Sequence, residues 1–318
     1  SLTQLEYLDF THNQLVGNIP YAHWENIHNL VQVDLRTIPE LGNQLSLYNL
    51  DLSDNNINGV IPRWIMDSTT LISLNLSHNN LVGFEVQHFA STPKFLDMHD
   101  NQLQGNFPFI PLPSSSIQYI DFSHNHLNGS IPARIFNNLY LNFLSLSNNS
   151  FTGTIPTSVC DAVSLDVINL SNNHLNGTIP SCLIETMKDL SGNMFTGNIP
   201  NTFHISCALQ ILNFHNNQLQ GTFPKSLKNC TKLEVLDIGN NKIAGPFPCL
   251  QGEIKSTLRV LILRNNLFLG GIQCSYDDQT TWQQLQIVDL AFNNFSGPLN
   301  AKYLASWEAM MENGKGTQ

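Results

Sequence analysis

The sequence predicts an α/β-type repeat solenoid, because one short pattern recurs along nearly all of its 318 residues. In the stretch 164–180, SLDVINLSNNHLNGTIP, the residues Leu165, Ile168 and Leu170 have the spacing of a short strand with one buried face. A polar turn follows at Asn173, with a glycine four residues later and a proline seven residues later. Most copies of this pattern are 24 residues apart. One copy cannot bury its own apolar edge, so the copies must stack.

The asparagine at position 173 marks a phase that twelve units share. A fixed period in the twenties, with L-x-x-L-x-L before this asparagine, is typical of leucine-rich repeats. We therefore expect a curved leucine-rich-repeat superhelix with a parallel β-sheet on its concave face and a mostly irregular convex side. Because an amide both donates and accepts hydrogen bonds, the asparagines are expected to satisfy backbone groups of the turns. This structural asparagine ladder consists of Asn55, Asn79, Asn101, Asn125, Asn149, Asn173, Asn193, Asn217, Asn241 and Asn266.

The solenoid is predicted over residues 1–299, with about 13 repeats. The pattern is irregular near residues 36–50, where Ile38 stands at the marker position and the next marker follows only 17 residues later, and near 183–192, where Lys188 stands at a strand position. Residues 300–318 leave the pattern and are expected to begin a non-repeat island or cap segment. Since the first residues are already in phase without a preceding cap, we expect the chain to be a fragment of a longer protein.

The composition favours an extracellular protein. A formal net charge of −10 argues against a nucleic-acid partner. No apolar run reaches the roughly 18 residues that cross a bilayer, and no signal-like segment is expected in this stretch. Six cysteines and seven Asn-x-Ser/Thr sequons point to the secretory pathway. The candidate glycosylation sites are Asn75, Asn128, Asn148, Asn169, Asn176, Asn229 and Asn294.

The repeat phase also suggests how the cysteines pair. Cys249 and Cys274 each lie eight residues after a marker asparagine, so they stack in adjacent units at a distance that suits a disulfide. Cys207 and Cys230 lie ten and eleven residues before their markers and form a second, less regular candidate pair. The remaining candidates are Cys160 and Cys182.

The sequence carries no catalytic motif. His-Glu-x-x-His, Gly-x-Ser-x-Gly and phosphate-binding glycine loops are all absent. The polar residues recur at repeat positions, which a structural role explains. We therefore expect no enzyme activity, no cofactor and no metal site.

Two columns of side chains are candidates for ligand contact on the concave face. Acidic residues stand four positions before many markers, and neighbouring exposed positions carry aromatic side chains. These columns either attract a basic ligand or are solvated strand positions whose rings pack on one another. Histidines near the markers of three consecutive units either merely tolerate exposed turn positions or make binding change below about pH 6. The expected ligand-binding residues are Tyr7, Asp9, His78, Phe95, Asp97, His99, Tyr119, Asp121, His124 and Phe143.

A second candidate surface lies nearer the C-terminal end of the repeats. Seven of the fourteen basic residues fall within 225–264. This uneven distribution of basic residues along the chain fits a separate surface for a co-receptor. A solvated convex face explains most of the lysines equally well. The expected partner-binding residues are Val260, Ile262, Arg264, Ile287, Asp289 and Phe292.

Along nearly the whole chain, the pattern LxxLxLSxNxLxGxIP resembles the plant extracellular leucine-rich-repeat class. Residues 207–249, CALQILNFHNNQLQGTFPKSLKNCTKLEVLDIGNNKIAGPFPC, and the later segments LRVLILRNN and WQQLQIVDLAFNNFSGPLNAKYLASWEAMM are similar to the last repeats and the island of plant receptor-like proteins, most of all the Verticillium-wilt-resistance type. For the whole protein, the resemblance implies a signal peptide, a capped ectodomain, a single membrane helix and a short cytoplasmic tail without a kinase. It also implies perception of pathogen or peptide signals at the extracellular face of the plasma membrane, together with partner receptor kinases.

We therefore expect an ectodomain fragment that recognises a peptide or protein on the concave face and docks a co-receptor kinase ectodomain. The alternative from another class is a secreted leucine-rich-repeat inhibitor of a pathogen cell-wall-degrading enzyme, which predicts about ten repeats with cysteine caps at both ends. A truncated gene product without function is a third possibility. The in-phase start at Ser1 and the island-like WEAMM segment favour the receptor-like protein over the inhibitor.

Overall fold

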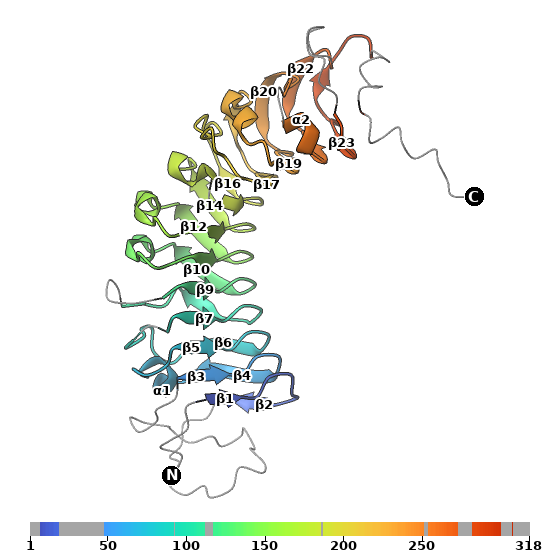
Figure 1. Cartoon of the computed structure of the whole chain (residues 1–318). Coiled ribbons are helices and arrows are strands. Elements are labelled where there is room, and N and C mark those ends of the chain that lie inside the picture. The colour runs from blue at the N-terminus through green and yellow to red at the C-terminus, as the bar shows by residue number, and fades with distance from the viewer. Residues whose placement is uncertain are drawn as a thin grey trace, which may run out of the picture. The chain divides into compact units, whose positions relative to one another are not determined.

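The computed structural model describes residues 7–18, 48–91, 93–111, 117–185, 187–250, 254–272, 282–299 and Trp307. Two compact units divide the chain, Ser1–Ile168 and Asn169–Gln318. In each unit, short parallel strands lie side by side, and successive repeats add strands to the same ladder (Figure 1). The predicted leucine-rich-repeat solenoid is thereby confirmed. The irregular segment expected near 36–50 and the island expected at 300–318 fall almost wholly outside the described residues.

The inner strands of the first unit form one parallel ladder. Their middle residues pair in register, for example Leu74 with Leu96 and Leu96 with Ile120, and these three side chains are fully buried. Since successive side chains of a strand point to opposite sides, the flanking residues face away from the core. We call the side of these strands that faces away from the core the sheet face. The strands are β1 (Tyr7–Asp9), β3 (Asn49–Asp51), β5 (Ser73–Asn75), β7 (Phe95–Asp97), β9 (Tyr119–Asp121), β11 (Phe143–Ser145) and β13 (Val167–Asn169).

A second set of strands follows the turns of the first unit, and short helical segments lie after them. Pro62, Pro132 and Pro156 each stand directly before a helical segment, where a missing backbone N–H costs no hydrogen bond. The outer strands are β2 (Val16–Asn18), β4 (Asn56–Ile61), β6 (Asn80–Phe84), β8 (Gln104–Asn106), β10 (His126–Ser130) and β12 (Ser150–Thr154). The helical segments are α1 (Arg63–Met66), η2 (Ala133–Asn137) and η3 (Thr157–Asp161).

The second unit repeats this plan. Leu212 pairs with Leu236 and Leu236 with Leu261, and all three are buried. Its inner strands are β15 (Met187–Asp189), β17 (Ile211–Asn213), β19 (Val235–Asp237), β21 (Val260–Ile262) and β23 (Ile287–Asp289). Its outer strands are β14 (His174–Gly177), β16 (Met194–Phe195), β18 (Gln220–Gly221), β20 (Lys242–Pro246), β22 (Leu267–Gly270) and β24 (Asn294–Phe295). The helical segments are η4 (Ser181–Glu185), η5 (Lys225–Asn229) and α2 (Ile254–Thr257). In the stretch expected to be irregular, 183–192, β15 occupies the usual three-residue strand position.

The ten asparagines of the structural ladder are only 5% to 9% exposed. Asn125 shows how each is used. Its Nδ2 donates to the carbonyls of Met98 (2.9 Å), Phe122 (3.2 Å) and Ser123 (3.1 Å), and its Oδ1 accepts the N–H of Leu103 at 2.9 Å. Each such amide therefore closes its own turn and binds the preceding repeat.

Gly129 shows why glycine suits the position four residues after a marker asparagine. Gly129 has a φ of +80°, and a Cβ at this position would stand 2.6 Å from Oδ1 of Asn106 in the preceding repeat. The backbone conformation therefore disfavours a side chain here, and the Asn106 side chain would also have to move.

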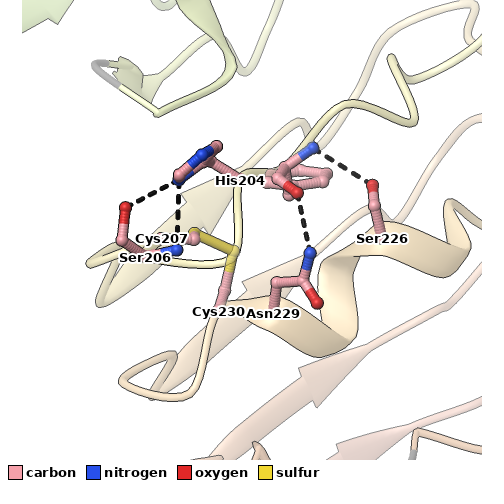
Figure 2. Close-up of a disulfide and its surroundings, with 7 residues drawn as sticks. His204, Ser206, Cys207, Ser226, Asn229 and Cys230 are labelled. Carbon is pink, nitrogen blue, oxygen red and sulfur yellow. Dashed lines mark hydrogen bonds between the residues drawn. A yellow bond between two sulfur atoms is a disulfide. The ribbon is translucent and has the colours of Figure 1, made fainter.

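A disulfide joins Cys207 to Cys230, the pair that the repeat phase places in adjacent units (Figure 2). Beside it, the N–H of Phe203 donates to Oγ of Ser226 at 3.1 Å, and Nδ2 of Asn229 donates to the Phe203 carbonyl at 2.9 Å. These bonds attach η5 to the repeat before it.

Three further cysteines, Cys160, Cys182 and Cys249, are also disulfide-bonded. Cys274 lies outside the described residues. The pairings Cys160–Cys182 and Cys249–Cys274 stay predictions.

Candidate ligand-binding face

Three aromatic rings form a continuous stack on the sheet face of the first unit. Phe95, Tyr119 and Phe143 begin strands β7, β9 and β11 and pair in register. The ring centroids of Phe95 and Tyr119, and those of Tyr119 and Phe143, are 4.4 Å apart, with the rings 13° and 7° from parallel. All three residues are half-buried. Because the rings stack face to face, they cover one another's faces, and the sheet face presents a row of ring edges that is still partly open to solvent.

Asp97 and Asp121 end strands β7 and β9, and the structure corrects the expectation that they are exposed. Their exposed fractions are only 6% and 8%. The reason is the turn that follows each strand. Oδ1 of Asp121 accepts the N–H of Ser123 at 2.8 Å and its hydroxyl at 2.6 Å, and Oδ1 of Asp97 accepts the N–H of His99 at 3.1 Å. These carboxylates thus cap turns and present little surface to a ligand.

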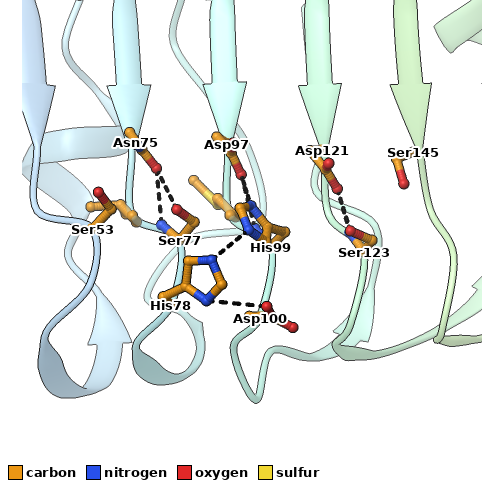
Figure 3. Close-up of polar contacts among 12 residues, drawn as sticks. Ser53, Asn75, Ser77, His78, Asp97, His99, Asp100, Asp121, Ser123 and Ser145 are labelled. Carbon is orange, nitrogen blue, oxygen red and sulfur yellow. Dashed lines mark hydrogen bonds and ion pairs between the residues drawn. The ribbon is translucent and has the colours of Figure 1, made fainter. Parts of the chain in front are cut away.

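Histidines and carboxylates at the turns after β5, β7 and β9 form a connected polar network (Figure 3). His99 Nδ1 lies 2.6 Å from Oδ1 of Asp97, and its Nε2 lies 2.9 Å from Nε2 of His78. His78 Nδ1 lies 3.1 Å from Oδ2 of Asp100, whose Oδ1 lies 3.5 Å from Nδ1 of His124. The structure thus brings together the three histidines that the sequence indicated.

Asp100 and Asn148 belong to this network, although the sequence analysis did not name Asp100 and gave Asn148 only as a candidate glycosylation site. His78, Asp100, His124 and Asn148 occupy the same turn position in successive repeats, with φ between 50° and 54°. Asp, Asn and His tolerate this left-handed conformation better than most residues. Asn148 Nδ2 lies 3.1 Å from Nε2 of His124. The alternation of histidine and acid in this column is the sequence signal that would have found them.

Burial and neighbouring charge alter three ionisation equilibria on this face. The hydrogen bond to Asp97 raises the pKa of His99, against an opposing effect of burial. Burial raises the pKa of Asp121, and the hydrogen bonds from Ser123 oppose this. Burial also raises the pKa of Tyr119, so its phenol stays neutral. The expected change of binding below about pH 6 stays a prediction.

Tyr7 and Asp9 lie on β1, away from the aromatic stack. The strands β3 and β5 stand between β1 and β7 in the ladder. Asp9 is exposed, and its Oδ1 accepts the N–H of Thr11 at 2.9 Å. Tyr7 pairs with Asn49 in register, and its side chain is outside the described set. The structure therefore does not join these two residues to the central cluster.

In the second unit, Arg264, Asp289 and Phe292 form a small cluster. Arg264 Nη1 lies 3.2 Å from Oδ2 of Asp289, and its Cζ lies 4.7 Å from the centroid of the Phe292 ring. Phe292 is 71% exposed and has a φ of 55°. This conformation is uncommon for a bulky residue and is usually kept where function needs it.

Val260, Ile262 and Ile287 lie beside this cluster on β21 and β23. Val260 pairs with Ile287, and Ile262 with Asp289. Val260 and Ile262 are half-buried, whereas Ile287 is 54% exposed. The six expected partner-binding residues thus occupy one region of the second unit.

Family profiles for leucine rich repeats match six segments that together cover more than half of the chain: residues 4–25, 46–103, 116–138, 140–162, 164–185 and 207–250. With the stacked strands and the asparagine ladder, these matches define the class. The chain belongs to the leucine-rich-repeat family.

Within this family, the chain is a homologue of plant receptor-like proteins. It is 42% identical to Receptor-like protein 49 of Arabidopsis thaliana over 274 residues, which are 85% of this chain and 29% of the relative. The chain thus spans less than a third of that relative's length. Receptor-like proteins are a non-enzymatic family. Among the described residues, no helix has both the length and the apolar character needed to cross a bilayer.

The fold is similar to that of solved plant receptor ectodomains. The peptide hormone receptor RGFR1 in complex with RGF2 superposes with a TM-score of 0.74 at 28% identity, over 95% of this chain and 46% of that one. The Arabidopsis receptor kinase HAESA, in complex with the peptide hormone IDA and the co-receptor SERK1, gives 0.65 at 27% identity, over 96% of this chain and 56% of that one.

Proposed function

We propose that the chain is the extracellular ligand-recognition region of a plant receptor-like protein that acts with partner receptor kinases. The observation that carries this proposal is the stack of Phe95, Tyr119 and Phe143 on the sheet face. Half-exposed rings aligned across three strands are typical of a contact surface. The similar ectodomains of RGFR1 and HAESA are in complex with peptide hormones, which supports the same class of ligand here.

The proposed ligand is a peptide or protein segment that crosses the strands of the first unit. Because neighbouring rings cover the faces of Tyr119, a ligand side chain would meet ring edges, with which aromatic side chains make edge-to-face contacts. The Tyr119 hydroxyl donates to Oδ2 of Asp121 at 3.4 Å, and this carboxylate is only 8% exposed. We therefore expect apolar contacts with the rings, rather than charge, to select the ligand.

A panned library of random linear peptides tests this proposal. Peptides selected on the wild-type chain are expected to bind the Tyr119→Ala variant about tenfold more weakly, because the middle ring of the stack is lost. Tyr140→Ala is the matched control, since Tyr140 is 59% exposed in the same unit but outside the stack. Equal affinity of selected peptides for wild type and Tyr119→Ala, or no selection at all, would contradict a ligand on this face.

The proposed co-receptor surface consists of Arg264, Ile287 and Phe292 with their neighbours in the second unit. Its support is the exposure of Phe292 and Ile287 and the unusual backbone conformation of Phe292. The HAESA complex contains SERK1, so a kinase ectodomain of that kind is the proposed partner.

In the same proposal, the whole protein is a glycoprotein of the Verticillium-wilt-resistance type at the extracellular face of the plasma membrane, with a role in plant defence. Its support is the resemblance of residues 207–249 and the later segments to that type, together with the sequons. The disulfide Cys207–Cys230 suits an oxidising compartment.

A further inference from the structure

Two histidines from adjacent repeats approach each other through nitrogen atoms of the same kind. Nε2 of His78 and Nε2 of His99 are 2.9 Å apart. The two rings are nearly perpendicular, at 79°, with their centroids 4.4 Å apart. This centroid distance is too short for lone pairs that point straight at each other, so the two lone pairs converge at an angle.

The other nitrogen of each ring is occupied by a carboxylate. Oδ1 of Asp97 lies 2.6 Å from Nδ1 of His99, and Oδ2 of Asp100 lies 3.1 Å from Nδ1 of His78. A carboxylate accepts hydrogen bonds, so it keeps the ring proton on Nδ1. In the neutral rings, both Nε2 atoms then carry bare lone pairs. Two bare lone pairs at this separation repel each other unless a proton or a metal ion lies between them.

Two other histidines of the chain show a different arrangement. Nδ1 of His215 also faces a carboxylate, that of Asp237 at 3.0 Å, but its Nε2 lies 2.9 Å from the amide Nδ2 of Asn240. His124 likewise has an amide nitrogen, that of Asn148, beside its Nε2. An amide N–H satisfies the lone pair in those two cases, whereas His78 and His99 offer their lone pairs to each other.

We propose that His78 and His99 bind a divalent transition-metal ion through their two Nε2 atoms, with copper(II) favoured. Two nitrogens about 2.0–2.1 Å from one ion stand about 2.9 Å apart when they subtend a right angle, which is the tetragonal geometry of copper(II) rather than the tetrahedral one of zinc. Asp97 and Asp100 orient the rings from the far side, as carboxylates do for metal-bound histidines. His78, His99 and Asp100 each offer one ligand atom within 4.8 Å of the other two.

The repeat geometry builds this site without a metal-binding motif in the sequence. His78 sits one residue before its marker, in the left-handed turn position, and His99 sits two residues before the next marker. When the two turns stack, the two rings face each other although their positions relative to the markers differ by one residue. The side chains of His78 and Asp100 are 45% and 40% exposed, so the remaining coordination positions are open to solvent or to a bound partner.

Copper(II) titration of tag-free protein tests the site. We expect one binding event per chain by calorimetry and a paramagnetic resonance spectrum with two imidazole nitrogens. His78→Gln and His99→Gln are each expected to weaken this event at least tenfold. His124→Gln and His215→Gln are matched controls that should leave it unchanged, because their Nε2 atoms face amides. Circular dichroism checks that each variant is folded.

Three outcomes decide the proposal. Loss of the event in both site variants and its retention in both controls supports it. Equal copper binding by wild type and by a His78→Gln/His99→Gln double variant overturns it. A spectrum with one nitrogen or none in the wild type also overturns it, and assigns the space between the rings to a shared proton. Magnesium and calcium, which prefer oxygen ligands, are expected to give no binding event in any of these proteins.

Discussion

At the scale of single residues, the buried turn asparagines satisfy backbone groups of two repeats at once. Asn125→Ala would leave the N–H of Leu103 without its partner, and the carbonyl of Met98 would keep only the longer bond from Asn101 at 3.3 Å. Each unsatisfied buried group costs about 1–3 kcal/mol. We therefore expect Asn125→Ala to lower the free energy of unfolding by about 3 kcal/mol, measured by urea denaturation.

Asn128→Ala is the control for this prediction, because Asn128 lies in the same repeat but is exposed. Its expected effect is within about 0.5 kcal/mol of wild type. Similar losses in the two variants would show that the buried ladder contributes no more than a surface amide.

Asp121 gives a prediction that depends on pH. Its raised pKa means that the ionised carboxylate is less favourable in the folded chain than in the unfolded one. At low pH both states are protonated, so the penalty is absent; it grows as pH rises through the raised pKa and is complete above it. Asp121→Asn should therefore match wild-type stability at low pH and exceed it at neutral pH. The turn is retained, since Asn75 accepts the corresponding bonds from Ser77 at 3.1 and 2.8 Å.

Thermal melting of both proteins across pH 3 to 7 measures this difference. A gain for Asp121→Asn that is the same at both ends of the range would assign it to packing rather than to charge.

Phe292 has a left-handed backbone conformation that is unfavourable for a bulky residue, and its ring is exposed. The corresponding positions in the two preceding repeats are Asn240 and Asn265, with φ of 53° and 51°. Because asparagine tolerates this conformation, Phe292→Asn is expected to stabilise the chain by about 1 kcal/mol. If the ring contacts a co-receptor, the same variant should bind the SERK1 ectodomain about tenfold more weakly in a surface-immobilised assay.

Leu299→Asn is the matched control, since Leu299 is 63% exposed and has no left-handed conformation. It should change neither stability nor SERK1 binding. A stabilised Phe292→Asn variant that binds SERK1 as well as wild type would remove Phe292 from the proposed surface.

At the scale of structural elements, the outer strands carry the sequons whose asparagines are exposed enough to be glycosylated. Asn128 on β10, Asn176 on β14 and Asn294 on β24 are exposed. By contrast, Nδ2 of Asn75 donates to Oδ2 of Asp51 at 3.1 Å, and that of Asn229 donates to a backbone carbonyl. A glycan on either nitrogen would replace a hydrogen bond of the fold.

We therefore expect glycans on Asn128, Asn176 and Asn294, and unmodified Asn75 and Asn229, when the chain is secreted from plant cells. Enzymatic deglycosylation in heavy-oxygen water, followed by peptide mass spectrometry, reports each site. Occupancy of Asn75 or Asn229 above that of the three exposed sites would contradict this reading. Outer-strand glycans would leave the aromatic stack on the inner strands free for a ligand.

At the scale of the whole molecule, the strands that the structure describes pair with strands of neighbouring repeats. A repeat stack is therefore expected to respond locally to damage. Hydrogen exchange of Asn125→Ala should quicken for amides between about Met98 and Asn125, the stretch that the side-chain bonds of Asn125 join. Strands β19 and β21 of the second unit should exchange as in wild type. Uniformly faster exchange in both units would instead show that the chain opens as one cooperative body.

The sequence by itself determined the solenoid, its phase and its ladder. A parallel stack with a constant period brings the same position of each repeat to the same place. The sequence alone therefore assigns Asn125 to a turn and gives Cys207 its disulfide partner. The same reasoning put Phe95, Tyr119 and Phe143 in one column, and their rings do stack.

Only the tertiary structure decided what depends on turn conformation and side-chain direction. Asp97 and Asp121 form a second outward column beside the column of aromatic rings, yet both are buried, because each carboxylate bends back to cap its own turn. His78 and His99 occupy different columns, and no period relates them. They meet because a left-handed turn at His78 directs its ring toward the next repeat, a contact between unlike positions that a repeat pattern does not encode.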